Sequence, residues 1–370
     1  MRLINGGMRS PQELGYRQPA EWEPHAACWV AWAHDAEEWA GQIEAARREF
    51  VAMCEAIAPT EKLEILVMPG EATGAARLAL GHLLDQGLAR FHAIPYGDIW
   101  LRDIAPIFVS NRTKHTKQLD QLEQLASTEP KKQTQLAALD FAWNGWGEKY
   151  LFKHDAQVAE AIASSLDLPI FKFPWILEGG AVEVDGQGTC LTTKQCLLNP
   201  NRNPHLPQSE IETRLKQALG VNKILWLDRG LKNDHTDGHI DTIARFVAPG
   251  QVMCMRSLGN TDPNQEVLDQ IATRLKTFVD AQGRSLQVVE IPSPGKVLDR
   301  HGELMPASYL NFYIANDRVV VPTYGSEFDD LAVKAIAVHF PDRQVIGLSA
   351  RAILSGGGAF HCITQPQPLI

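Results

Sequence analysis

The chain repeats one local pattern, in which an apolar run is followed by a turn and a second apolar run. Such a pattern predicts a β-hairpin, because a polar, glycine-containing turn between apolar runs lets two strands pair. It occurs at residues 181–193, 243–255 and 310–324, and a fourth hairpin forms if 107–109 pairs with 139–143. One hairpin cannot bury its apolar face alone, so the repetition favours a fold in which similar units pack together.

The segment at 111–135 interrupts the fourth hairpin. It is rich in Lys, Gln, Thr and Glu and has almost no apolar residues. We therefore expect a solvated insertion at the tip of that hairpin.

Helical spacing of apolar residues follows several of these hairpins. The expected helices are 156–166, 209–219, 264–281 and 329–339. Before the first hairpin, helices at 37–58 and 72–88 alternate with strands at 63–68 and 91–94. This alternation is typical of an α/β protein, and it predicts a repeated hairpin-plus-helix module. The 370 residues suffice for two or three domains or for one large one.

Composition narrows the class of protein. Lys and Arg number 35 against 44 Asp and Glu, and the resulting charge of -9 argues against a nucleic-acid surface and favours a cationic or neutral ligand. The six cysteines form no Cys-x-x-Cys pair, so a disulfide framework and a zinc ribbon are disfavoured and a reducing compartment is expected. The sequence shows neither a secretory leader nor a membrane-spanning run of about 18 apolar residues, and we expect a cytoplasmic protein that binds no membrane.

Polar residues that are hard to explain as surface gather where the hairpins begin. They lie at 100–103, 178–180 and 237–241, and a glycine-rich segment at 356–362 ends the chain. If the modules are arranged about a centre, these entry points meet there.

Each of these residues also has a purely structural interpretation. Asp103 after Arg102 is typical of a surface ion pair, Glu178 beside two glycines of a turn, and His239 of a structural histidine. Cys362 differs, because three glycines precede it and free backbone amides can polarise a thiolate. The other cysteines are expected to be small buried hydrophobic residues, namely Cys28, Cys54, Cys190, Cys196 and Cys254.

Taken together, a thiol, an imidazole and carboxylates fit chemistry on a guanidinium group. Carboxylates accept paired N–H bonds from this planar cation, so Asp103 and Asp241 can hold it. Its central carbon would then face Cys362, whose thiolate is the side chain best able to attack it. His239 can protonate departing ammonia and then activate water.

At these residues the sequence closely resembles the agmatine deiminase family, the porphyromonas-type peptidylarginine deiminase group of the guanidine-modifying superfamily. The resemblance covers nearly the whole chain and lies in the segments 19–25, 100–103, 177–180, 198–205, 236–241, 311–316 and 357–365. It implies a five-bladed, pseudo-symmetric α/β propeller (a pentein) of ββαβ modules, forming one domain over 1–370. It also implies Cys362 as nucleophile, His239 as acid/base, Asp103 and Asp241 as guanidinium ligands, and Glu178 as a further active-site carboxylate.

Three positions depart from the family pattern. The family usually has Asn where this chain has Ala181 and Ala359, and an acidic residue where it has His235. The expected catalytic set is complete, so these changes are expected to affect loop support or the recognition of the far end of the substrate.

The expected reaction is cofactor-free deimination of agmatine to N-carbamoylputrescine and ammonia. Agmatine lacks the α-carboxylate of arginine, so its site should be acidic or aromatic at the far end. Trp100 and Asp237, with the backbone at Gly357 and Gly358, are the candidate substrate contacts; the orientation of Arg102 stays open.

Several alternatives remain open from the sequence. In one alternative the substrate is arginine, a peptidyl arginine or another alkylguanidine. In another the protein binds a guanidine without catalysis. A metal-dependent hydrolase using His235, His239, Asp237 and Asp241 is a further alternative, although Gly238 disfavours a helical pair of histidines. The expected partner is a small cationic guanidine, with a homo-oligomer as a candidate assembly, and no phosphate-binding loop indicates nucleotide use.

Overall fold

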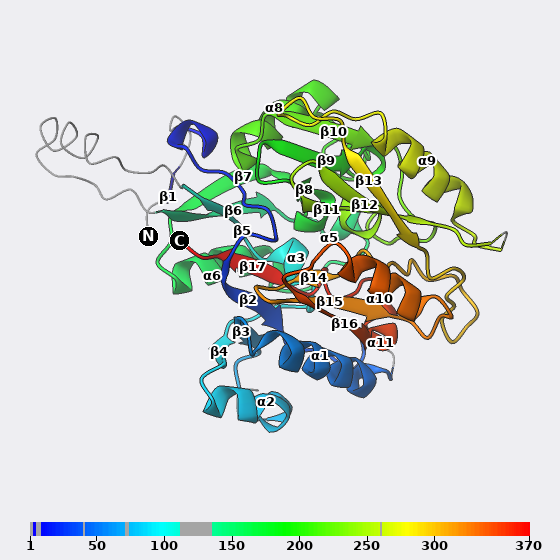
Figure 1. Cartoon of the computed structure of the whole chain (residues 1–370). Coiled ribbons are helices and arrows are strands. Elements are labelled where there is room, and N and C mark those ends of the chain that lie inside the picture. Colours follow the sequence, from blue (N-terminus) through cyan, green and yellow to red (C-terminus); the bar gives the residue numbers. More distant parts are fainter. Residues whose placement is uncertain (1–2, 5–8, 40, 71–73, 112–134, 260) are drawn as a thin grey trace, which may run out of the picture.

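The described strands form five small sheets (Figure 1). The computed structural model describes residues 3–4, 9–39, 41–70, 74–111, 135–259 and 261–370. Over these residues the fold is mixed α/β, as expected from the alternation of helical and strand patterns.

Each sheet contains an antiparallel strand pair. A helix then leads to a third strand, which runs parallel to the member of the pair beside it. The sheets are β1(Leu3–Ile4)-β7(Ile170–Ile176)-β6(Leu136–Ala142)-β5(Ile107–Ser110), β10(Lys223–Leu227)-β9(Thr189–Thr193)-β8(Glu183–Val184), β11(Ala244–Ala248)-β12(Gln251–Arg256)-β13(Gln287–Pro292), β14(Tyr313–Ile314)-β15(Arg318–Thr323)-β16(Gln344–Ser349) and β17(Gln365–Pro368)-β2(His25–Ala31)-β3(Lys62–Val67)-β4(Ala89–Ala93). The connecting helices are α6 (Asp155–Ser165), α8 (Gln208–Leu219), α9 (Gln265–Leu275), α10 (Asp329–Ala337), α1 (Ile43–Ile57) and α2 (Ala75–Asp85).

Short helical turns precede or follow many strands, and several of them enter the site described below. They are η1 (Gln12–Leu14), α3 (Leu101–Ile104), α5 (Gly145–Glu148), η3 (Gly179–Ala181), α7 (Lys194–Leu197), η4 (Ile240–Thr242) and α11 (Arg351–Leu354).

All four predicted hairpins are confirmed. The strands β8 and β9, β11 and β12, and β14 and β15 pair antiparallel across the expected turns. The fourth pairs β5 with β6, but residues 107–109 lie opposite 137–139 rather than 139–143, with Ile107 opposite Leu139. The predicted insertion at 111–135 falls almost wholly on 112–134, which lies outside the described residues.

The fifth sheet was predicted only in part: the strands expected at 63–68 and 91–94 are β3 and β4, but the pairing of β17 with β2 was not predicted. It pairs β17, near the end of the chain, with β2, so that Gln365 lies opposite Trp29 (Figure 1). Strands separated by more than 300 residues share no local turn, and no hairpin pattern marks them.

Two predicted helices are too long. The helix expected at 264–281 ends at Leu275, and Asp280, which accepts the backbone N–H groups of Gln282 and Arg284, lies in a separate turn beyond it. The helix expected from residue 37 begins at Ile43.

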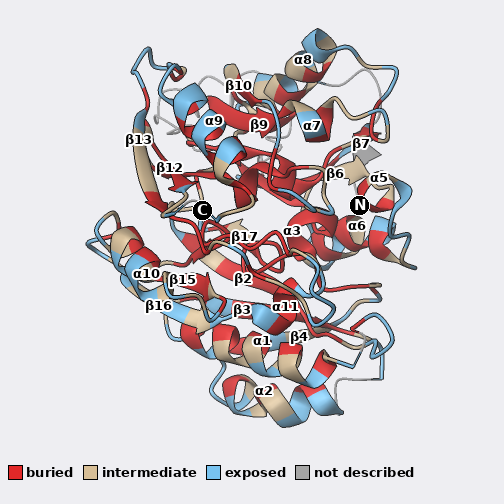
Figure 2. Ribbon diagram, turned by 90° about the vertical axis from the view of Figure 1, so that its right-hand side faces the viewer, coloured by how far each residue is buried: buried red, intermediate tan, exposed pale blue. Residues whose placement is uncertain are grey.

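Burial follows the layers of the fold. Buried residues gather on the inner strands and site loops, and exposed residues lie on the outer sides of helices such as α9 and α10 (Figure 2). In α1 the buried positions Ile43, Ala46, Phe50 and Cys54 repeat at helical spacing, which places one apolar face on the sheets. Within the described ranges, no helix is long and apolar enough to cross a membrane.

Candidate active site

The polar entry segments of the hairpins meet in one place. Asp103 lies on α3 and Glu178 directly precedes η3. Asp241 lies on η4, which begins directly after His239. The turns α3 and η4 both contact η3. Four segments that are far apart in the sequence, the loop carrying Cys362 included, therefore build one buried site.

Gly180 occupies the middle of this site. A methyl carbon added there would lie 2.5 Å from His239 Nδ1, 3.0 Å from Asp103 Oδ1 and 3.1 Å from Asp241 Oδ2. The backbone N–H of Gly180 donates to Asp103 Oδ1 at 2.9 Å. Glycine at this position thus leaves space among three functional side chains and orients one of them.

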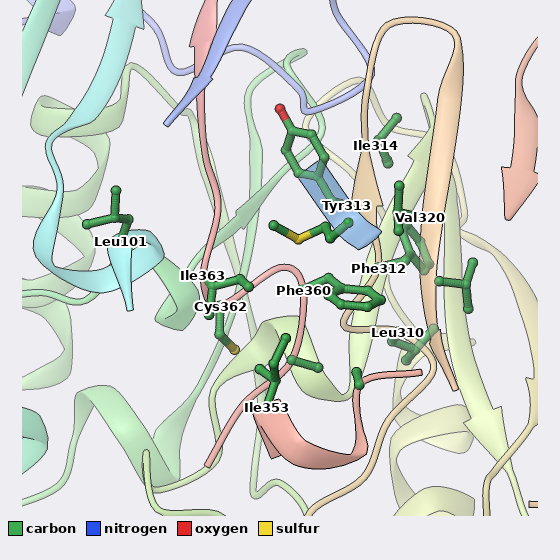
Figure 3. Close-up of a cluster of buried hydrophobic side chains, with 14 of the residues drawn as sticks. Leu101, Leu310, Phe312, Tyr313, Ile314, Val320, Ile353, Phe360, Cys362 and Ile363 are labelled. Atoms are coloured by element: carbon green, nitrogen blue, oxygen red, sulfur yellow. The ribbon is translucent and has the colours of Figure 1, made fainter. Parts of the chain in front are cut away.

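Cys362 lies on the C-terminal loop with its side chain in the buried site. Figure 3 shows it beside Ile363, on a loop packed near Leu310 and Phe312. Asn311 orders this loop: its Oδ1 accepts the backbone N–H of Cys362 at 3.2 Å, and its Nδ2 lies 3.1 Å from the Cys362 sulfur. The sequence motif 311–316 was noted only as part of the resemblance, and the structure shows what its first residue contacts.

The surroundings of the thiol favour its protonated form. Burial, reinforced by the carboxylates of Asp241 and Asp103, raises the pKa of the Cys362 thiol well above its ordinary value. A cation bound between the sulfur and these carboxylates would favour the thiolate.

The pKa values of Asp103 and Asp241 are shifted in opposite directions. Burial raises the pKa of Asp103, and the neighbouring Asp241 adds to this effect. Burial acts on Asp241 in the same sense, but the hydrogen bond and charge of His361 overcome it and lower the pKa of Asp241. The site therefore holds one carboxylate that is stably ionised and one that gains from a bound cation.

Several buried polar atoms of the site have no hydrogen-bond partner in the described structure. They are both ring nitrogens of His239, Oδ1 of Asp241 and Oε2 of Glu178. Buried polar atoms are nearly always paired, so these atoms indicate a place for a polar ligand.

A cavity of 150 Å³ reaches the sulfur of Cys362. At about 30 Å³ per water molecule it has room for a small molecule only. Its wall includes three predicted contacts, Trp100, Gly357 and Gly358, together with Asp103 and Cys362. A wider cavity of 620 Å³ lies outside it and shares Trp39, Tyr150 and His235 with its wall.

Trp146 is a cavity residue that sequence reasoning missed. Its Nε1 donates to Asp103 Oδ2 at 2.8 Å, and its ring lines the cavity. Trp146 has φ 53°, between Gly145 and Gly147 at φ 62° and 82°. A tryptophan held in this left-handed conformation is strained, and the Gly-Trp-Gly pattern was the signal available in the sequence.

Four predicted site residues do not line the 150 Å³ cavity, namely Glu178, Asp237, His239 and Asp241, and the first two pair with charged protein groups. Glu178 is fully buried and pairs with Arg202. Asp237 binds Lys149 at 2.7 Å and Arg202 at 2.9 Å and does not line the 150 Å³ cavity. Although burial opposes them, the hydrogen bonds from Lys149, Asn201 and Arg202 lower the pKa of Asp237. Its role in substrate binding stays a prediction.

Arg102 points away from the cavity. Its guanidinium pairs with Glu21 at 2.9 Å and donates to the backbone oxygen of His361 at 3.2 Å. It is therefore not placed to receive a carboxylate of the substrate.

The set proposed for a metal hydrolase does not converge. Among the described residues, the group whose ligand atoms all lie within 4.8 Å of one another is Glu178, Cys196 and His239, without His235, Asp237 or Asp241. Because Glu178 already pairs with Arg202, a metal ion there would face a guanidinium charge.

The three departures from the family pattern lie around the site. Ala181 and Ala359 are buried, and their backbone groups bond to Thr192 and Asn311. His235 stacks on Tyr150 at the boundary of the two cavities. The first two support loops, and the third lies on the entrance path.

Comparison with known proteins agrees with this geometry. The model of the Porphyromonas-type peptidyl-arginine deiminase family matches residues 17–368. A Legionella pneumophila (strain Paris) protein provisionally named an agmatine deiminase is 39% identical over 365 residues, which cover 97% of each chain. The agmatine deiminase of Medicago truncatula is 35% identical over 386 residues, with 98% of each chain covered.

A solved structure extends the likeness to the fold. The agmatine deiminase of Enterococcus faecalis superposes with a TM-score of 0.85 at 30% identity, covering 100% of this chain and 99% of the other. With a family match over nearly its full length, this chain belongs to the Porphyromonas-type peptidyl-arginine deiminase family.

Proposed function

We propose that this protein is an agmatine deiminase, which hydrolyses agmatine to N-carbamoylputrescine and ammonia. The observation that carries the proposal is the meeting of the Cys362 thiol with the carboxylates of Asp103 and Asp241 around the space left by Gly180. The relatives named agmatine deiminase support the choice of substrate.

Binding of the guanidinium follows from the charges of the site. The cation lies between Asp103 and Asp241, where Asp241 Oδ1 is the unpartnered acceptor. Paired N–H bonds to carboxylates fix the plane of the guanidinium and face its central carbon toward Cys362. The bound charge also favours ionisation of the thiol.

The reaction then proceeds by addition and elimination. The thiol transfers its proton to His239 as the sulfur forms a C–S bond to the central carbon, and the C–N bond to the leaving nitrogen breaks as His239 passes that proton on to convert it to ammonia. Water, deprotonated by His239, attacks the same carbon, and cleavage of the C–S bond restores the thiol and releases the urea product. Glu178, held by Arg202, is the further carboxylate beside His239.

The tail of agmatine suits the cavity wall. The described residues that line the inner cavity include the acids Glu38 and Asp98 and the aromatic rings of Trp39 and Trp100, and none of them is a lysine or arginine. A terminal ammonium is favoured by acids and aromatic faces, whereas the carboxylate of arginine would find no cationic partner among them.

We also propose that residues 1–370 form one five-bladed α/β propeller with this site on its axis. Five sheets of similar construction support the proposal, as does the pairing of β17 with β2, which joins the two ends of the chain in one sheet.

A substrate panel tests the proposed function. Ammonia release is measured as kcat/KM for agmatine, arginine and a blocked peptidyl arginine, with Cys362→Ala as the inactive control. Agmatine is expected to be preferred over both arginine forms. Preference for an arginine form would change the assigned substrate and leave the proposed mechanism in place. Absence of ammonia release from every guanidine would refute the proposed deiminase activity.

A further inference from the structure

His361, next to the proposed nucleophile in sequence, lies between two carboxylates. Its Nδ1 is 2.7 Å from Asp241 Oδ2 and its Nε2 is 2.8 Å from Glu21 Oε2. The histidine is 1% exposed. An ionised carboxylate only accepts hydrogen bonds, so each ring nitrogen is placed to donate to the carboxylate beside it, as in an imidazolium.

Glu21 is held in place as an anion. Its carboxylate pairs with Arg102 and with Arg245, each at 2.9 Å, and accepts the backbone N–H of Ile314 at 2.9 Å. Although burial alone would raise the pKa of Glu21, the charges of Arg245, His361 and Arg102 hold it well below its ordinary value. Arg245 also pairs with Glu183 at 3.0 Å.

The buried network is electrically balanced. Its cations are Arg102, Arg245 and His361, and its anions are Glu21, Glu183 and Asp241. Burying ions is favourable only when each charge is compensated in this way. Removal of the His361 charge would therefore leave Asp241 without its closest cationic partner.

The two oxygens of Asp241 have different surroundings. Oδ2 lies 2.7 Å from His361, 3.4 Å from Asn311 Nδ2 and 3.6 Å from the Cys362 sulfur. Oδ1 is buried and has no hydrogen-bond partner in the described structure. One oxygen is thus fixed by the protein, and the other is left for a ligand.

We propose that His361 and Glu21 are positioning residues for Asp241, which hold its Oδ2 so that Oδ1 stays ionised and free to accept an N–H of the guanidinium. The inference rests on the proposed function only in taking a guanidine as the substrate. Neither residue touches the substrate, and the effect is transmitted through Asp241.

The expected pH dependence of kcat/KM follows from the charged groups around His361 and Asp241. Those groups are Glu21, Arg102, Arg245, Glu183, Asp103, His239 and Cys362. Loss of the imidazolium leaves Asp241 beside the carboxylate of Asp103, so protonation of Asp241 becomes easier and its pKa rises. The acid limb of kcat/KM is then expected to move to higher pH.

The experiment compares the full-length wild-type enzyme with His361→Asn and Glu21→Gln. His361→Asn is expected to shift the acid limb of kcat/KM for agmatine upward by about one pH unit or more, with a decrease of at least about tenfold at neutral pH that arises mainly from KM. Glu21→Gln removes an anion and leaves Arg102 and Arg245 beside the retained histidine, so it is expected to lower kcat/KM without an upward shift of the acid limb. His92→Asn is the matched control, because His92 also binds a buried glutamate, Glu64 at 2.6 Å, on the distant strands β4 and β3. It is expected to leave the pH profile unchanged.

A folded His361→Asn enzyme whose acid limb coincides with that of the wild type would overturn the proposal. If neither variant folds, ¹⁵N NMR of the histidine-labelled wild type decides: a ring protonated on both nitrogens at pH 8.5 supports the proposal, and its absence overturns it. Failure of the wild type to release ammonia from any guanidine would refute the proposed function and leave the NMR result as it stands.

Discussion

Replacing Gly180 with alanine would place a methyl group in the centre of the site. The added carbon lies 2.5 Å from His239 Nδ1, about 0.9 Å less than the 3.4 Å at which ordinary contact begins, so the imidazole must move by nearly this amount. A displacement of about 1 Å at a reacting group costs on the order of 100-fold in rate, or roughly 2.7 kcal/mol. Overpacking should cost roughly 1–3 kcal/mol of unfolding free energy. Gly180 has no positive φ, so the backbone itself tolerates alanine.

The assay measures kcat/KM for ammonia release and, separately, the thermal unfolding of the variant. Gly81→Ala is the matched control, because a methyl group at this position in α2 meets Arg77 Nε at an ordinary 3.5 Å. Alanine in a helix interior is favoured by up to about 1 kcal/mol over glycine, so the control should be fully active and at least as stable. A folded Gly180→Ala enzyme within about threefold of wild-type kcat/KM would refute the claim that the space at Gly180 is needed for chemistry.

Further predictions concern the groups around this space. Cys362→Ala should remain folded and release no ammonia, and an adduct with substrate on a different cysteine, detected by mass spectrometry, would contradict the assignment. Asp103→Asn should lower kcat/KM, with the corresponding activation free energy raised by on the order of 2–5 kcal/mol, because a buried guanidinium loses one charge partner. Near-normal turnover would make this carboxylate structural. Trp146→Phe removes the donor to Asp103 Oδ2. It should raise the activation free energy that corresponds to kcat/KM by about 1–3 kcal/mol while the variant still folds. Because burial raises the pKa of Asp103, falling pH should protonate Asp103 before Asp241 in the wild type and raise KM for agmatine; His361→Asn moves this acid limb by raising the pKa of Asp241 past that of Asp103.

Local patterns were sufficient for much of the fold. The hairpin at β11 and β12 and the helix α8 appear where apolar spacing predicted them, because turn residues and helical periodicity act over a few residues. The family was also identified from the sequence and is confirmed by the family match. The glycines before Cys362 indicated a backbone that can approach a ligand closely, and in the structure a methyl group at Gly358 would lie 2.9 Å from the Cys362 sulfur.

Tertiary structure decided what depends on partners distant in the chain. The pairing of β17 with β2 and the contact of His361 with Glu21 join residues more than 300 positions apart, and no periodicity encodes them. The sequence left the orientation of Arg102 open and proposed Asp237 as a substrate contact. The structure places Arg102 beside Glu21 and Asp237 beside Arg202, because a buried or half-buried charge is stabilised mainly by the opposite charge that the fold places beside it.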